Sequence, residues 1–230
     1  MKNFKTLILS AIVPLSAALS PAAFAGTQPS QIVELFTSQG CSSCPPSNAL
    51  VNDWSADDDI LALTYSVEYW DYLGWKDTFA DPKFSARQRA YAQAIGHGRV
   101  YTPQMVINGQ IDKFRYSRAE INDVRLDDDS LTIKFDGNDV IVPANPDVES
   151  PAAVRLVTYT PGAQSVKVMR GENGGRTLTL SNVVTDVTDL GVWTNKDSRF
   201  ALPDAQPGSA YAVLIQSEEY GPIIAAAVRD

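Results

Sequence analysis

The sequence predicts an α/β domain followed by an all-β, sandwich-like region, and three observations lead to this prediction. Apolar segments alternate with helical patterns only as far as about residue 125. A run of three acids, Asp127–Asp129, then marks a change of character. From Leu131 onward, short apolar or alternating segments recur between turn residues and none has a convincing helical pattern. Such spacing is typical of an antiparallel sandwich or barrel.

The first part of the chain has the element order βαβαββα. The predicted strands cover residues 32–37, 60–67, 100–107 and 110–113, and the predicted helices cover about 43–54, 82–95 and 117–124. Asp81-Pro82 provides a cap and a first-turn proline for the second helix. Asn108-Gly109 is a strong two-residue hairpin signal, and Ser117 with Glu120 fits a capping box. The order predicts a parallel βαβ unit, a hairpin and a closing helix.

The N-terminal segment has the features of a secretory signal peptide. Lys2 and Lys5 precede an apolar run from Leu7 to Leu19, and Ala23-Phe24-Ala25 fits the small-x-small cleavage pattern. We therefore predict a signal peptide over 1–25, a first domain over 26–127, an all-β domain over 128–230, and a protein of the periplasm or secreted medium. An uncleaved membrane anchor is the alternative. After removal of the signal, no remaining apolar stretch approaches the length of a membrane span.

The charge of the chain argues against two classes of partner. The net charge is −8, and removal of Lys2 and Lys5 with the signal makes it more negative by two. Lysines and arginines are not concentrated in any stretch. We therefore predict no binding to nucleic acid or to anionic membranes.

Cys41 and Cys44 are the only cysteines, and they follow a predicted strand at the start of a predicted helix. A helix N-terminus stabilises a thiolate because its first N–H groups are unpaired and its dipole is positive there. We expect the Cys41 sulfur to lie at the surface and to attack a partner disulfide, with Cys44 resolving the mixed disulfide. Such exchange needs no cofactor.

Three other interpretations of the pair compete with redox exchange. A structural disulfide closing so short a loop stabilises by only about 2 kcal/mol. A zinc site requires four ligands, and the chain has two cysteines and one histidine. Copper capture by Cys41, Cys44 and His97 uses a ligand set that suits copper, but a histidine between Gly96 and Gly98 is more often a solvated loop residue. We therefore predict no metal.

The element order, the Cys-x-x-Cys after the first strand and Thr102-Pro103 before the hairpin together resemble the thioredoxin fold. The segments VELFTSQGCSSCPP, YWDYLGWKD, RQRAYA, VYTPQMVING and GENGGRTLTLSNVV are similar to a family of secreted proteobacterial thioredoxin-like proteins, domain of unknown function 1223. The resemblance covers nearly the whole mature chain. It brings no established substrate.

The resemblance implies roles for three further residues, and the aromatic segment that follows the second strand adds Trp70 as a candidate. Pro103 corresponds to a cis proline that faces the disulfide and contacts substrate, with Thr102 beside it; an ordinary trans proline on an edge strand is the alternative. Glu34 corresponds to a buried acid that takes the resolving cysteine's proton, or else is an exposed strand residue. Trp70 is a candidate for the substrate groove, with core packing as the alternative.

These features predict an exported thiol–disulfide oxidoreductase that acts on protein thiols or disulfides and is recharged by a redox partner protein. Typical thioredoxins carry Trp-Cys-Gly-Pro-Cys, whereas Gly40 precedes Cys41 here and Ser42-Ser43 lies between the cysteines. The direction of electron flow is therefore open. The alternatives are a non-catalytic periplasmic binding or assembly protein on the same scaffold and a copper-binding chaperone.

Overall fold

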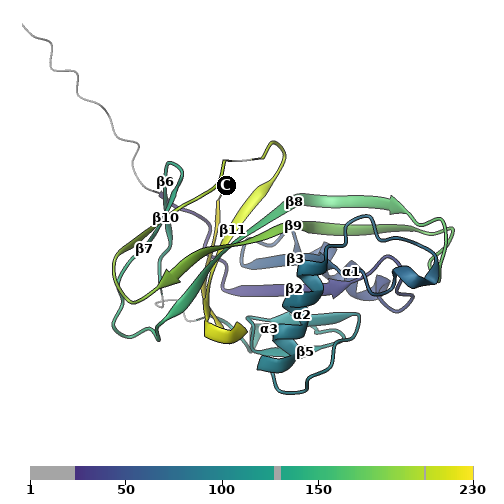
Figure 1. Cartoon of the computed structure of the whole chain (residues 1–230), viewed down its shortest axis with the longest axis horizontal. Coiled ribbons are helices and arrows are strands. Elements are labelled where there is room, and N and C mark those ends of the chain that lie inside the picture. The colour runs from purple at the N-terminus through teal and green to yellow at the C-terminus, as the bar shows by residue number, and fades with distance from the viewer. Residues whose placement is uncertain (1–23, 127–130, 205, 230) are drawn as a thin grey trace, which may run out of the picture.

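The computed structural model describes residues 24–126, 131–204 and 206–229 (Figure 1). It shows a mixed α/β fold that is mostly β, with a large mixed sheet and few helices. The large sheet has eight strands in the order β12-β11-β8-β9-β3-β2-β4-β5. Their bounds are β2 (Gln31–Thr37), β3 (Ile60–Ser66), β4 (Gln104–Ile107), β5 (Ile111–Lys113), β8 (Ala152–Lys167), β9 (Thr177–Trp193), β11 (Ala210–Ser217) and β12 (Ile223–Arg229).

The N-terminal elements form the centre and one edge of this sheet. β2 and β3 are parallel, while β4 and β5 add to β2 as an antiparallel hairpin. β2 and β3 are buried along their whole length, as their nearly continuous apolar sequences predict for central parallel strands. The predicted order of strands and helices in this half is thus observed.

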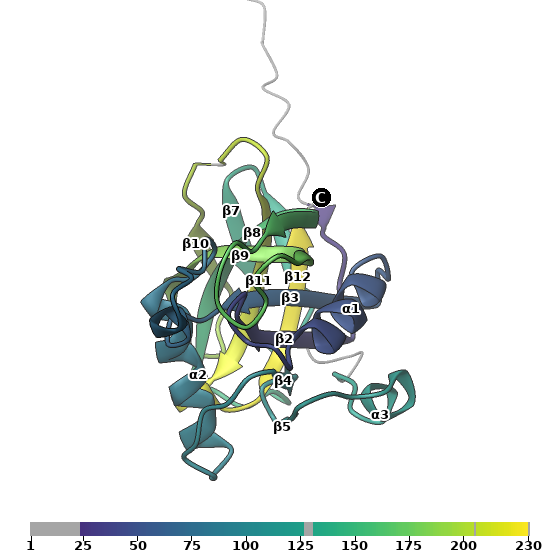
Figure 2. The same ribbon diagram turned by 90° about the vertical axis from the view of Figure 1, so that its right-hand side faces the viewer.

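Two helices cover opposite faces of the N-terminal strands (Figure 2). α1 (Pro45–Trp54) packs Val51 and Trp54 against the face of β2 that carries Val33 and Leu35. α2 (Pro82–Ala94) packs against the other face of these strands, in the apolar cluster described in the next paragraph. The side chain of its N-cap residue, Asp81, accepts a hydrogen bond from the backbone N–H of Lys83. The short helix α3 (Arg118–Asn122) has the capping box that its sequence predicts. Two 3-10 turns are also present, η1 (Asp71–Leu73) and η2 (Glu218–Tyr220).

The largest apolar cluster contains residues from both halves of the chain. Phe36, Leu63 and Tyr91 pack together with Val157 and Leu214. The C-terminal strands β8, β9, β11 and β12 belong to the same sheet as β2–β5. The predicted division at residue 127 falls outside the described residues, and the two-domain organisation stays a prediction.

A second, smaller sheet covers the C-terminal end of the large one. It contains β1 (Phe24–Ala25), β6 (Lys134–Asp136), β7 (Asp139–Val142) and β10 (Ser198–Ala201), in the order β1-β6-β7-β10. Phe135 and Val142 pack against Val154, Trp193 and Val213 of the large sheet. The C-terminal region therefore has two facing sheets, but one of them continues into the N-terminal half.

The strands β8 and β9 are longer than the sequence suggests. We predict separate strands over 153–159 and 165–169, and over 176–180 and 183–187, whereas each pair forms one strand. Pro161-Gly162 reads as a turn but lies at a register shift between Thr160 and Ala163. This irregularity bends the hairpin without ending it, and its tip extends beyond α1 (Figure 1).

The N-terminal segment can be described only at its end. Residues 1–23 of the predicted signal peptide lie outside the described residues, while Phe24 and Ala25 pair with Phe135 and Lys134 in β1 and β6. No helix in the described part of the chain is long and apolar enough to cross a membrane.

Candidate functional site

Cys41 and Cys44 form a disulfide between the end of β2 and the start of α1. Their Cα atoms are 5.5 Å apart. Cys44 is the N-cap residue of α1, and Pro45 and Pro46 occupy the first two helical positions. The prolines fit there because N–H groups in the first turn have no partner within the helix. They also remove two of the N–H groups that would face a thiolate at this helix start.

The expectation that the Cys41 sulfur lies at the surface is wrong. Both cysteines are 0% exposed, although Ser42 and Ser43 between them are exposed. Polar groups of Ser43, Glu172 and Asn173 make hydrogen bonds or polar contacts with this loop. Three segments that lie far apart in the sequence contact it.

The first covering segment is the loop around Thr102-Pro103, whose peptide bond is cis. Ser43 joins this loop to the disulfide: its Oγ lies 3.4 Å from Cys41 Sγ and donates to the carbonyl oxygen of Thr102, also at 3.4 Å. The indole N–H of Trp70 donates to Thr102 Oγ1 at 2.8 Å. The predicted site residues Cys41, Thr102, Pro103 and Trp70 therefore lie together.

The second covering segment follows β3 and carries Trp70. A Cβ atom placed on Gly40 would lie 3.1 Å from Trp70 Cβ, a very close contact. Glycine before Cys41 thus allows the backbone to approach the tryptophan.

The third covering segment is the tip of the β8–β9 hairpin, which we define as residues 170–176 and call the hairpin tip. Asn173 in this tip is 0% exposed. Its Nδ2 donates to the carbonyl oxygen of Gln39 at 3.0 Å and to that of Cys41 at 2.8 Å. Its Oδ1 accepts from Arg176 at 2.8 Å. All hydrogens and the oxygen of the amide are thereby paired.

Glu172, next to Asn173, adds a second contact with the disulfide loop. Its Oε2 accepts from the backbone N–H of Ser42 at 3.2 Å. Both contacts involve residues outside the candidate site residues that the sequence predicts. The residues are about 130 positions from the cysteines, and no local pattern indicates such a long-range pairing.

Gln39 and Asp77 hold the disulfide loop from within. The carboxylate of Asp77 is buried and accepts from the backbone N–H of Gln39 at 2.7 Å. Burial raises the pKa of Asp77. Gln39 Oε1 accepts from the indole N–H of Trp75 at 2.8 Å. The loop is therefore fixed on its inner side by the segment that follows Trp70.

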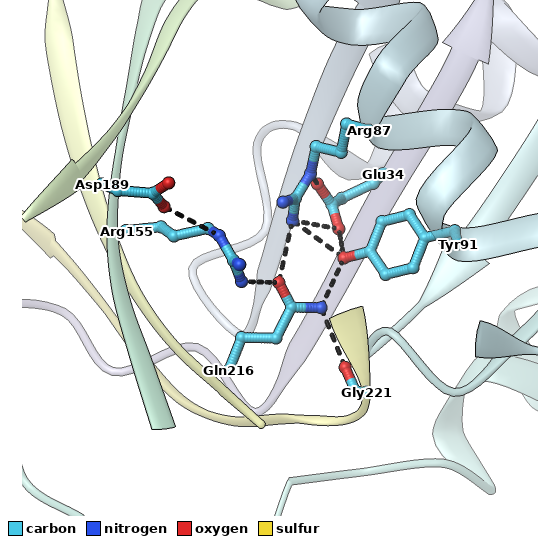
Figure 3. Close-up of polar contacts among 7 residues, drawn as sticks. All are labelled: Glu34, Arg87, Tyr91, Arg155, Asp189, Gln216 and Gly221. Carbon is cyan, nitrogen blue, oxygen red and sulfur yellow. Dashed lines mark hydrogen bonds and ion pairs between the residues drawn. The ribbon is translucent and has the colours of Figure 1, made fainter. Parts of the chain in front are cut away.

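Glu34 is buried, as the resemblance implies, but its partners lie on α2 (Figure 3). Arg87 donates from Nε and Nη2 to the two carboxylate oxygens at 2.8 and 3.0 Å. The hydroxyl of Tyr91 donates to the same carboxylate. The carboxylate opposes a guanidinium, and its described hydrogen bonds include neither cysteine. This geometry does not favour the predicted proton relay, which stays untested.

The pair of Glu34 and Arg87 belongs to a polar network between the two halves of the chain (Figure 3). Gln216 of β11 donates to the Tyr91 hydroxyl at 3.1 Å and accepts from Arg155 of β8 at 2.6 Å. Burial is the largest single influence on the pKa of Arg87 and lowers it, but Glu34, Tyr91 and Tyr65 together outweigh it and the net shift is upward. The guanidinium therefore stays charged, and the network has the features of a structural ion pair.

His97 lies in a different environment from the one that copper capture requires. Its Nε2 is 3.0 Å from Asp112 Oδ1 of β5, and its Nδ1 accepts from the backbone N–H of Arg99. Within the described ranges, no group of three or more His, Cys, Asp or Glu side chains is placed to hold a metal ion. The ring nitrogens of His97 are thus engaged away from Cys41 and Cys44.

Comparison with known protein families finds one family model that matches the chain. A family model described as "Protein of unknown function (DUF1223)" matches residues 32–216. No curated protein matches the chain.

Two solved structures are similar to the whole fold. The crystal structure of protein AGR_C_4864 from Agrobacterium tumefaciens is 29% identical, with a TM-score of 0.72 over 89% of this chain and 94% of that chain. HBP35 of Porphyromonas gingivalis is 11% identical, with a TM-score of 0.54 over 90% of this chain and 76% of that chain. At that identity the second likeness concerns the fold alone.

Proposed function

The chain belongs to the DUF1223 family, whose description gives no activity, and we propose from the geometry of its own site that it is a thiol–disulfide oxidoreductase acting on the cysteines of other proteins. The observation that carries the proposal is the Cys41–Cys44 disulfide at the start of α1, joined through Ser43 to the loop at Thr102-Pro103. This constellation is similar to thioredoxins. A thioredoxin-like fold is part of the proposal, supported by the parallel β2–β3 pair and the antiparallel β4–β5 hairpin.

The exchange follows from thiol chemistry. In the reduced protein, the Cys41 thiolate attacks a substrate disulfide, which forms a Cys41–substrate S–S bond and releases one substrate thiolate. The Cys44 thiolate then attacks the Cys41 sulfur, re-forms the Cys41–Cys44 bond and releases the second substrate thiolate. Two electrons pass to the substrate. The reverse sequence oxidises a substrate dithiol, and a redox partner protein restores the starting state.

Ser43 is the polar side chain best placed to assist this step. Its hydroxyl lies 3.4 Å from Cys41 Sγ, and by turning from the carbonyl oxygen of Thr102 it can donate to a thiolate there. The helix dipole of α1 adds to the stabilisation of a negative charge. Because Pro45 and Pro46 supply no N–H groups, this hydroxyl carries more of the stabilisation than it would in a proline-free helix start.

A redox titration in glutathione buffers tests the proposal. We expect a reduction potential above about −300 mV, since structural disulfides in exported proteins fall below that value. A Cys44→Ala variant should form a mixed disulfide through Cys41 with a substrate protein, whereas the double variant Cys41→Ser/Cys44→Ala should form none. A potential well below −300 mV together with no trapped partner would contradict the proposal.

The complete burial of the disulfide favours a second candidate, a non-catalytic binding or assembly protein in which the pair is a structural disulfide. Such a protein keeps its biological role when Cys41 is replaced by serine, provided that it still folds. An oxidoreductase loses its role in the same variant. A complementation assay with Cys41→Ser therefore separates the two candidates.

Export to the periplasm or medium is also part of the proposal. Its support is the pattern of Lys2, the apolar run and Ala23-Phe24-Ala25, together with a formed disulfide, which persists in oxidising compartments. Cell fractionation followed by N-terminal sequencing should find a mature chain that begins at Gly26. A full-length chain in the cytoplasm would contradict it.

A further inference from the structure

We propose that the hairpin tip is a gate over the Cys41–Cys44 disulfide, with Asn173 as its latch, and that the disulfide reacts only when the tip has moved away. The inference rests on the proposed function for its biological meaning, because a gate selects which reductants and substrates reach the sulfur atoms. The gate itself concerns only the access of reagents to the disulfide and does not depend on that function.

The first step is the position of the tip. Cys41 is 0% exposed, although Ser42 and Ser43 beside it are exposed. Asn173 donates to the carbonyl oxygens of both Gln39 and Cys41, and Glu172 accepts from Ser42. Three hydrogen bonds therefore hold the tip on the loop that contains the attacking cysteine.

The second step is that the tip is built to move as a unit. Short backbone hydrogen bonds close it on itself: Gly175 donates to Val168 at 2.8 Å, and Gly174 donates to Gly171 at 3.0 Å. An apolar cluster at its base contains Val168, Leu178 and Leu180. The tip can leave the disulfide loop without losing these internal contacts, because they do not involve the cysteines.

The third step concerns the few bonds that resist opening. Glu172 is exposed, so its bond to Ser42 competes with water and contributes little. Asn173 is fully buried, and its two bonds to carbonyl oxygens supply most of the polar resistance. Trp75 and Phe79 pack against the apolar cluster at the base of the hairpin and add to it. Opening is a local equilibrium, and the reaction rate of the disulfide follows the open fraction.

Reduction of the oxidised protein by dithiothreitol tests this gate. One dithiothreitol dithiol becomes a cyclic disulfide and passes two electrons and two protons to the Cys41–Cys44 pair. The second-order rate constant is read from alkylation of the released thiols and mass spectrometry, without denaturant. The Asn173→Ala variant should react about thirtyfold faster than wild type, because its two hydrogen bonds to the disulfide loop no longer oppose opening.

Two further variants serve as controls for the reduction experiment. Glu172→Ala removes only the exposed bond and should accelerate reduction about twofold to threefold without a risk to folding. Ser165→Ala is the matched control, because Ser165 is exposed on the same hairpin and its described side-chain contact is with Thr179. It should react at the wild-type rate, and circular dichroism should show the same fold for all the proteins.

Equal rates for wild type and Asn173→Ala, with the fold intact, would overturn the gate. So would a wild-type rate as high as that of the urea-unfolded chain. These outcomes are independent of the proposed function. If Asn173→Ala is reduced faster but the protein exchanges disulfides with no protein substrate, the gate is supported and the oxidoreductase proposal is rejected. If the protein is an active oxidoreductase but Asn173→Ala is reduced at the wild-type rate, the gate is rejected and the oxidoreductase proposal is supported.

Discussion

At the scale of single residues, the contacts of Glu34 show how a buried charge is stabilised in this protein. The carboxylate and the Arg87 guanidinium are nearly inaccessible, with side chains 1% and 3% exposed. Two parallel hydrogen bonds and the Tyr91 hydroxyl replace the water that both ions have lost. The geometry fulfils the conditions under which a buried ion pair is tolerated.

Replacing Arg87 by methionine should therefore destabilise the protein strongly. The change leaves Glu34 buried without its counter-charge, and we expect the free energy of unfolding to fall by about 3–5 kcal/mol. Urea denaturation followed by circular dichroism measures the difference. Arg118→Met is the control: Arg118 pairs with Asp57 at the surface, where both side chains are 39% exposed, and its loss should cost about 1 kcal/mol or less.

The site residues divide into those with a local sequence signal and those without one. Cys41, Cys44, Thr102 and Pro103 are predicted because redox pairs and their neighbouring proline follow fixed local patterns, and the structure brings them together. Asn173 has no such signal. Its role depends on the path of a long hairpin, and an asparagine among glycines reads only as a turn residue.

At the scale of elements, the start of α3 depends on one exposed carboxylate. The hydrogen bond from Lys113, with those from Ser117, holds the pKa of Glu120 at about 2, below its ordinary value of 4.5. A carboxyl whose folded-state pKa is lowered stabilises the fold above its unfolded-state pKa. This contribution is lost as the pH falls from 4.5 toward 2.

We therefore expect Glu120→Gln to reduce the free energy of unfolding at pH 7 and to converge with wild type near pH 2. Urea titrations at pH 7, 4, 3 and 2 measure the difference. Because Glu120 and Lys113 are both exposed, 1 M NaCl should shrink the effect at pH 7. A difference that grows as the pH falls would contradict the capping role.

The junction between β3 and β9 joins the two halves of the sheet through few backbone pairs. Asn182 supports it with a backbone φ of 48° and a buried side chain. Its Nδ2 donates to the carbonyl oxygen of Ala62, and its Oδ1 accepts from the backbone N–H of Gly162, both at 3.0 Å. The side chain thus fixes β9 to β3 and also fills the irregularity that bends β8.

Asn182→Ala should lower the free energy of unfolding by about 2–4 kcal/mol, since both bonds are lost and alanine is strained at positive φ. Asn182→Gly loses the same bonds without the strain and should cost about 1 kcal/mol less. Equilibrium urea unfolding compares the two variants. Equal stabilities would show that backbone conformation contributes nothing at this position.

The same junction explains why the strands of the C-terminal half are the least well predicted elements. Apolar alternation correctly indicates β structure over 153–159 and 183–187. Pro161-Gly162 and Asn182 are ordinary turn signals, but here they form an irregularity inside a continuous hairpin. Local propensity does not distinguish these outcomes, because the choice depends on whether β3 is available as a partner.

At the scale of the whole molecule, the sheet and its largest apolar cluster extend over both halves of the chain. Phe36 and Tyr91 from the first half pack with Val157 and Leu214 from the second. The network around Arg87 also requires Gln216 and Arg155. Cutting the chain near residue 127 would expose this apolar surface, the edge of β3 and the buried charges together. The energetic cost is too large for a small domain whose net stability is only about 5–15 kcal/mol.

We therefore expect the fragment 26–127 to be unfolded by circular dichroism and the full mature chain to unfold in one cooperative transition. Hydrogen exchange measured by mass spectrometry separates the halves, since peptides from β2 and β11 report on different parts of the sheet. Their opening free energies should coincide in urea, because neither half keeps a complete core without the other. Two separate transitions, or a fragment with native helical signal, would instead support independent domains. In that case the hairpin tip could leave the disulfide by separation of whole domains, and Asn173→Ala would no longer be the most sensitive position for opening the site.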